Sequence, residues 1–273
     1  MNQDSNLAST RVLFLRDHKI ETAILLFLLV TRLADTTLPQ LIFGAEVTPP
    51  WFLSLYTWIV YVLVAWLLWL NRNELSSLNI DKASIILFIV SGFLLTFFYI
   101  RDLSGWIPSI AALIILDSLR KNKFSFVGAN SDRSLRKHWY LPLLVLLIAV
   151  PVCLYNFRSG YITPLNLQSV SYAFLEASLP SIVFEEMIFR AGLWRFLKAL
   201  GIGDLWVFFI QAFFFWISHH HMLADGQLLD FWIVTPLISL ILGYIVLKSK
   251  SITLSTIGHL FYNFLIAYSA FGR

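Results

Sequence analysis

The sequence predicts an all-α protein, a polytopic membrane bundle of eight or nine transmembrane helices, from its composition and its apolar runs. Of 273 residues, 58% are apolar and 13% are charged, whereas a soluble domain carries about 25% charged residues. Several apolar runs approach the length of about 20 residues that a bilayer-spanning helix needs. The composition excludes a disordered chain, and a formal charge of +4 argues against a nucleic-acid partner. The one cysteine, Cys153, excludes a disulfide scaffold, and its apolar surroundings favour a packed side chain.

Nine apolar runs lie between polar breaks and are the candidate spans. The first, fourth and seventh are short, which makes them candidates for re-entrant or tilted segments, so the predicted count is eight or nine. The first 19 residues are polar and lack the pattern of a cleaved signal peptide, so we expect the first helix to be retained. The nine runs are Lys19–Ala34, Trp51–Leu70, Ala83–Ile100, Gly105–Leu119, Trp139–Phe157, Ser169–Phe189, Leu205–Ser218, Leu229–Leu247 and Ile252–Phe271.

Loop charges predict a cytoplasmic N-terminus, because Lys and Arg accumulate in short cytoplasmic loops. With nine spans, fifteen cations fall inside and three outside, which is typical of a bacterial inner-membrane protein. The basic cytoplasmic loop 120–138 separates N-terminal helices of unrecognised role (1–160) from a C-terminal part (161–273) with polar residues at membrane depth. The inner cations are Arg11, Arg16, Lys19, Arg72, Lys82, Arg120, Lys121, Lys123, Arg133, Arg136, Lys137, Arg195, Lys198, Lys248 and Lys250, and the outer ones are Arg101, Arg158 and Arg273.

The sixth run contains an unusual concentration of charge, Glu185, Glu186 and the following Arg190. Each ionisable group at the centre of a membrane helix costs about 2.5 to 3.5 kcal/mol on insertion scales, so such groups are functional candidates. Glu186 and Arg190 are four residues apart and can pair along one helix face. Glu185 is rotated by about 100° from Glu186 and points to a different neighbour. A structural ion pair between two helices is the alternative interpretation.

Two later runs carry polar side chains at helical spacing. Phe215 and His219 share one face, as do His259 and Asn263. A lone buried His is more often a core residue than a catalyst, but here two of them accompany a Glu pair. A Glu in an apolar cavity can take a proton from water, and His and Asn N–H groups can stabilise an oxyanion. The inventory therefore fits hydrolysis of a peptide bond by activated water.

Taken in order, these three elements resemble the CAAX prenyl proteases and bacteriocin-processing enzymes, a family of glutamic-type intramembrane endopeptidases. The resemblance covers roughly Ser169 to Phe271 and defines 161–273 as the protease core. It implies a membrane-anchored peptide or protein substrate within the lipid bilayer, cut near a C-terminal or processing segment. The roles that it implies are Glu185 as general base, His219 holding the attacking water, His259 and Asn263 as the oxyanion site, and Glu186 and Arg190 as supports.

Two questions about the chemistry stay open at this point. Glu185, His219 and His259 could instead form a three-ligand zinc site with an open position, although we favour a metal-independent mechanism without a cofactor. His220 and His221 follow His219, and we interpret them as a helix end at the interface rather than as a second metal site.

The alternative to an enzyme is a non-enzymatic membrane protein, either a scaffold or a proton-coupled transporter that uses the buried groups as a relay. Repeated halves, which many transporters show, are not evident in the sequence. The string Gly201-Ile202-Gly203-Asp204 is found in membrane aspartyl proteases, but its Tyr-Asp partner string is absent. We therefore interpret it as a turn between helices.

Overall fold

The computed structural model describes residues 19–34, 137–158, 185–224 and 226–270, with Ile182 and five single positions between 59 and 70. Every regular element within these residues is helical, which confirms the predicted class. The predicted runs 83–100 and 105–119, most of 51–70 and 169–189, and nearly all of loop 120–138 lie outside the described residues.

Most of the described helices coincide with the predicted runs to within a few residues. The sixth run is an exception, because its helical segment continues past the predicted end at Phe189 to Ala199, and the short helix His221–Ala224 was not predicted. Two of them, Leu141–Arg158 and Asp230–Ser249, are long and apolar enough to cross a membrane. The count of eight or nine spans and the cytoplasmic N-terminus stay predictions. In chain order the elements are α2 (Lys19–Ala34), η1 (Leu141–Val145), α9 (Leu146–Arg158), η3 (Glu186–Leu193), α12 (Trp194–Ala199), α13 (Asp204–Ile217), α14 (His221–Ala224), η4 (Asp230–Val234), α15 (Thr235–Ser249) and α16 (Ile252–Ala270).

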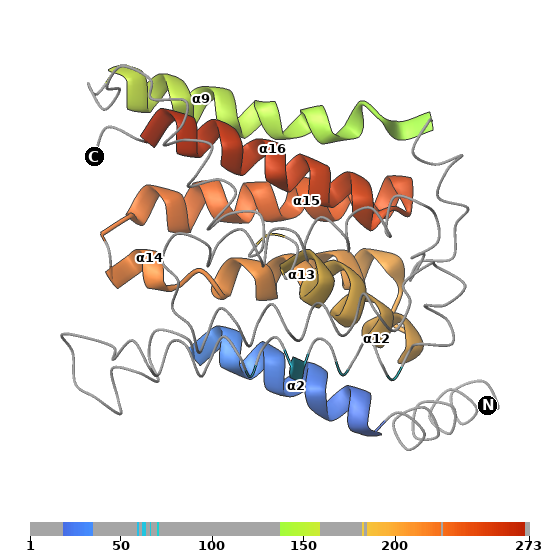
Figure 1. Ribbon diagram of the computed structural model, residues 1–273. Coiled ribbons are helices and arrows are strands. Elements are labelled where there is room, and N and C mark those ends of the chain that lie inside the picture. Colours follow the sequence, from blue (N-terminus) through green and yellow to red (C-terminus); the bar gives the residue numbers. More distant parts are fainter. Residues whose placement is uncertain are drawn as a thin grey trace.

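The C-terminal helices pack as neighbouring layers. Figure 1 shows α9, α16 and α15 stacked in that order, with α2 at the opposite side, where it contacts η3. α9 and α16 run parallel. A Cβ on Gly258 would lie 3.4 Å from Cα of Pro142, and farther along both helices Cys153 Sγ lies 3.5 Å from the Leu265 carbonyl oxygen.

α13 and α15 run antiparallel to each other. Ser239 Oγ donates to the Ala212 carbonyl oxygen at 3.0 Å, and at the far end of the pair Lys250 binds Asp204. With α9 parallel to α16, the starts of α9, α13 and α16 lie toward one end of the bundle, in agreement with the predicted loop sides. The described cations near this end are Lys137, Arg195, Lys198, Lys248 and Lys250, whereas Arg158 ends α9 at the other.

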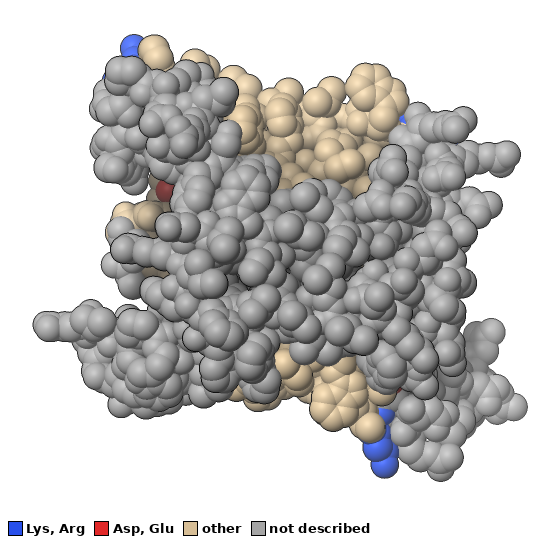
Figure 2. Space-filling model, viewed as in Figure 1, with Lys and Arg blue, Asp and Glu red and all other residues tan. Residues whose placement is uncertain are grey.

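Large apolar side chains cover the outside of the bundle. Trp206 is 68% exposed and Leu147 is 66% exposed. On the face shown in Figure 2, nearly all of the described surface is neither acidic nor basic. An apolar exterior of this extent marks a membrane or an interaction surface, in agreement with the predicted membrane bundle.

Close approach of α13 and α15 depends on Gly243. A Cβ at this position would meet Gln211 Nε2 and would lie 3.1 Å from Cδ2 of the Phe208 ring. Gln211 is fully buried, and its Nε2 donates to the Phe208 carbonyl oxygen at 2.9 Å, so it cannot move aside without breaking that bond. The missing side chain at 243 therefore sets the distance between the two helices.

Two ion pairs of Asp204 join the ends of three helices, α12, α13 and α15. Asp204 lies just before the predicted span 205–218 and binds Lys198 Nζ at 2.7 Å and Lys250 Nζ at 3.1 Å. Hydrogen bonds from Lys198 and then Lys250 lower the pKa of the Asp204 carboxyl below its ordinary value. Because the folded-state pKa is lowered, the ionised carboxylate stabilises the fold at neutral pH, and this stabilisation is lost as the pH falls through that pKa.

We predict that Gly243→Ala lowers the free energy of unfolding by about 1 to 3 kcal/mol through overpacking between α13 and α15. The matched control is Gly203→Ala, because Gly203 has an ordinary φ of -65° and a Cβ there meets nothing within 4 Å. Unfolding of both variants is followed in detergent micelles. Equal stability of the two variants would contradict the packing argument.

We predict that Asp204→Asn lowers the free energy of unfolding at pH 7 by less than about 1 kcal/mol, since the carboxylate is partly exposed and screened. The difference from wild type should shrink with added salt. It should begin to decline as the pH falls below about 4, the carboxyl's unfolded-state pKa, and should disappear only below the lowered folded-state pKa. The control is Lys248→Gln, whose ammonium lies over the Tyr244 ring instead. A difference that stays constant as the pH falls from 7 to 2 would disprove the assignment to the ionised Asp204.

Candidate active site

The segment that carries the two glutamates is not a regular α-helix. Residues Glu186–Leu193 form a π-helix that begins directly after Glu185. π-helices are rare, occur mostly as short insertions and are frequent at functional sites. The α-helical offset of about 100° assumed from the sequence therefore does not hold beyond Glu186. Glu185, Glu186 and Arg190 are all buried, with 6%, 1% and 0% of their surfaces exposed.

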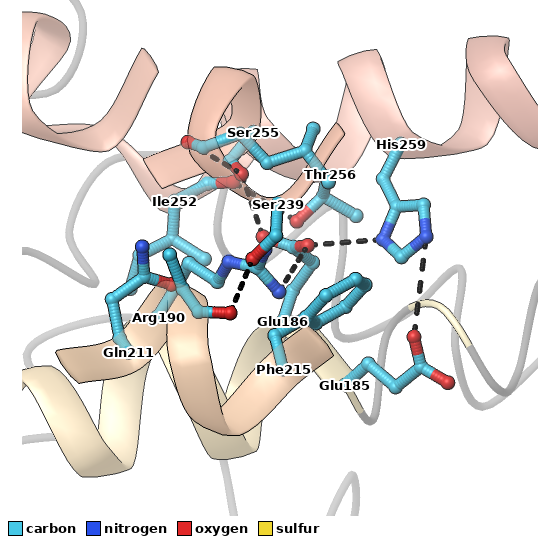
Figure 3. A network of polar contacts seen from close by, with 12 residues as sticks. Glu185, Glu186, Arg190, Gln211, Phe215, Ser239, Ile252, Ser255, Thr256 and His259 are labelled. Carbon is cyan, nitrogen blue, oxygen red and sulfur yellow. Dashed lines mark hydrogen bonds and ion pairs between the residues drawn. The ribbon is translucent and has the colours of Figure 1, made fainter. Parts of the chain in front are cut away.

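Glu186 is the centre of the polar network in Figure 3. Its Oε1 lies 3.0 Å from His259 Nδ1 and 3.3 Å from Arg190 Nη1, and its Oε2 accepts a hydrogen bond of 2.7 Å from Ser255 Oγ. The carboxylate is thus held by its own helix segment on one side and by two residues of α16 on the other. This arrangement confirms the predicted pairing of Glu186 with Arg190.

The Arg190 guanidinium interacts with Glu186 through its charge and with the Phe215 ring through its flat face. Its Cζ lies 4.0 Å from the centroid of the Phe215 ring, in a cation–π contact. Within the described part of the chain, its Nε, Nη1 and Nη2 atoms make no hydrogen bond of good geometry. Arg190 therefore neutralises the carboxylate and supports the Phe215 ring from η3.

His259 lies between the two carboxylates. Its Nδ1 faces Glu186, and its Nε2 lies 3.9 Å from Glu185 Oε2 (Figure 3). An ionised Glu186 can only accept, so the Nδ1 that faces it carries the proton. The ring nitrogen toward Glu185 is therefore the one available for chemistry, and Glu185 and Glu186 occupy different positions around one imidazole.

Phe215 joins His219 to this cluster. The Phe215 ring lies 4.7 Å from the His219 ring and 5.6 Å from the His259 ring, measured between centroids. His219 Nδ1 lies 2.8 Å from the Phe215 carbonyl oxygen, which makes Nδ1 the protonated nitrogen and Nε2 the acceptor in the neutral ring. The sequence prediction treated Phe215 as a motif partner and did not foresee this bridging position.

The remaining predicted residues lie nearby or outside the network. Asn263 lies one turn beyond His259 on α16 and is half-buried. His220 lies in the turn after α13 and His221 begins α14, as expected for a helix end. Gly201 has a φ of 75°, and residues 201–203 connect α12 to α13, which confirms the predicted turn between helices.

The zinc alternative would require three ligands that lie close together. Among the described residues, no three His, Cys, Asp or Glu side chains cluster in a way that could hold a metal ion. The choice between the two mechanisms stays a prediction.

Ser255 is a member of the network that the sequence prediction missed. It is fully buried, and it precedes His259 by four residues, so both lie on one face of α16. This spacing is the signal that could have identified it. A serine in an apolar helix is common enough that the spacing alone does not single it out.

Comparison with known families gives two matches. Residues 167–265, which contain all six predicted site residues, match the model of the type II CAAX prenyl endopeptidase Rce1-like family. Residues 53–183, where the sequence analysis found no motif before about residue 160, match the model of the transmembrane exosortase family. No curated protein and no solved structure matches the chain.

Both matches support an integral membrane protein, and the first supports a membrane protease with peptide substrates. The resemblance drawn from the three motifs is thereby confirmed. Residues 167–265 of this chain are thus similar to the Rce1-like family of type II CAAX prenyl endopeptidases.

Proposed function

We propose that the chain is an intramembrane endopeptidase that hydrolyses a peptide bond near a C-terminal or processing segment of a membrane-anchored substrate. The observation that carries this proposal is the position of His259 between two buried carboxylates, 3.0 Å from Glu186 and 3.9 Å from Glu185. Pairs of carboxylates in different surroundings are a general source of acid and base roles.

The surroundings of the two carboxylates support different roles. Both oxygens of Glu186 are engaged by Arg190, His259 and Ser255, so this group orients its neighbours. Glu185 lies 3.9 Å from His259 Nε2, longer than a hydrogen bond, and catalytic contacts are often long before substrate binds. Glu185 is therefore the proposed general base.

In the proposed reaction, Glu185 takes a proton from water, and the resulting hydroxide adds to the carbonyl carbon of the substrate. When the C–N bond breaks, the proton on Glu185 passes to the leaving amine. His219 supports the water, because the Nε2 of its neutral ring can accept a hydrogen bond. The same base thus serves both steps, and no cofactor is needed.

The oxyanion is stabilised by His259 and Asn263 in this proposal. Since Nδ1–H of His259 is committed to Glu186, Nε2 donates a proton to an oxyanion only when the ring is doubly protonated. Each donor to an oxyanion contributes about 2.7 to 4 kcal/mol in other hydrolases.

We predict that Glu185→Gln and His259→Ala each reduce cleavage by about 100-fold or more, because base and oxyanion contributions are of that size. The measurement is a proteomic comparison of membrane-peptide termini in cells that produce wild type or a variant at equal folded levels. Asp204→Asn is the control, since it removes a carboxylate outside the site.

The same experiment distinguishes a protease from the alternative, a proton-coupled transporter. Product termini that are present with wild type and Asp204→Asn and absent with both site variants support the protease. Proton-coupled flux through an intact protein that forms no product termini would instead support a transporter, and full activity of Glu185→Gln would disprove the assigned base.

We predict that chelation does not abolish cleavage, because the proposed base and oxyanion donors are side chains. Purified protein is treated with 1,10-phenanthroline and then dialysed, and the formation of product termini in membranes is compared before and after addition of zinc. Loss of activity that zinc restores would disprove the metal-independent mechanism.

A further inference from the structure

We infer that Ser255 is a positioning residue of this site, whose hydroxyl holds the Glu186 carboxylate and, through it, the His259 ring. This inference deepens the proposed function and rests on it for its catalytic consequence. The hydrogen bond itself is a property of the fold. Ser255 belongs to none of the three motifs and touches neither Glu185 nor the proposed reacting atoms.

The contacts of Ser255 define its donor direction. Its Oγ lies 2.7 Å from Glu186 Oε2 and 3.3 Å from the Leu242 carbonyl oxygen. A hydroxyl has one proton, and bonds to an ionised acceptor are shorter and stronger than neutral ones. Ser255 therefore donates to Glu186, and the contact with Leu242 keeps the hydroxyl between α15 and the carboxylate.

The two oxygens of Glu186 are held by different residues. Arg190 and His259 both bind Oε1, whereas Ser255 binds Oε2. The torsion that rotates a carboxylate about its last bond is broad and weakly restrained. A partner on each oxygen defines the carboxylate plane, so loss of Ser255 would let the group turn and would weaken its alignment with His259 Nδ1.

The helix makes this coupling rigid. Ser255 and His259 are four residues apart on α16 and reach the same carboxylate from one helix face (Figure 3). Their relative position is therefore independent of loops and of the distance between α15 and α16. The α16 backbone orients the His259 ring, and Ser255 orients the Glu186 carboxylate that accepts the hydrogen bond from His259.

The chain offers a matched control beside Ser255. Thr256 is also fully buried, but its Oγ1 donates to the Ile252 carbonyl oxygen of its own helix at 2.9 Å. Thr256→Ala removes a buried hydroxyl from the same turn without touching Glu186. Ser255→Thr keeps the hydroxyl, so it tests rescue and also serves if Ser255→Ala folds poorly.

The first experiment is ¹⁵N NMR of the full-length protein in micelles, labelled at its six histidines. The His259 ring is assigned by its loss in His259→Ala. We expect Ser255→Ala to change the His259 Nδ1 resonance, Ser255→Thr to restore it and Thr256→Ala to leave it unchanged. An unchanged resonance in Ser255→Ala would overturn the inference whether or not the protein is a protease.

The second experiment is a double-mutant cycle read as product termini per folded protein. Ser255→Ala should reduce cleavage by about 10- to 100-fold, because misplacing a group by about 1 Å costs about 100-fold. In a Glu186→Gln background it should cause little further loss, since residues acting through one another are not additive. Equal losses in both backgrounds would overturn the positioning role, while absence of cleavage by wild type would disprove the proposed function and leave the NMR test to decide.

Discussion

A charged group inside an apolar bundle governs the C-terminal half of this protein. The Glu186 carboxylate has 1% of its surface exposed, and an isolated charge in such a place would be prohibitively unstable. Arg190, His259 and Ser255 compensate it from η3 and α16. Removing one partner of a buried ion pair costs about 3 to 5 kcal/mol, so these two helices are held at one distance and one rotation.

The surrounding helices are arranged around that junction. α15 covers α16 and contributes the Leu242 carbonyl beside Ser255, while Gly243 on the same turn lets α13 approach closely. α13 in turn inserts Phe215 between Arg190 and the two imidazoles. One aromatic ring thus links the ion pair to His219.

The membrane makes the helices and the site residues predictable to different degrees. Apolar runs such as Leu229–Leu247 mark their helices because the bilayer sets their length, and charge at membrane depth singles out Glu185, Glu186 and Arg190. The π-helix at Glu186 could not be predicted, because it depends on the packing of buried polar groups and no repeating pattern in the sequence indicates it. Ser255 could not be identified from the sequence, because a single hydroxyl in a membrane helix costs little free energy and is therefore common.

The sequence by itself determined the helical class, the apolar exterior and the identity of the charged residues in the site, since scarce charge in an apolar chain is visible without coordinates. The tertiary structure alone decided which carboxylate is held and which faces the outer nitrogen of His259. The two glutamates are adjacent and chemically identical. What separates them is the direction in which each side chain leaves the helix, and only packing against α16 defines that direction.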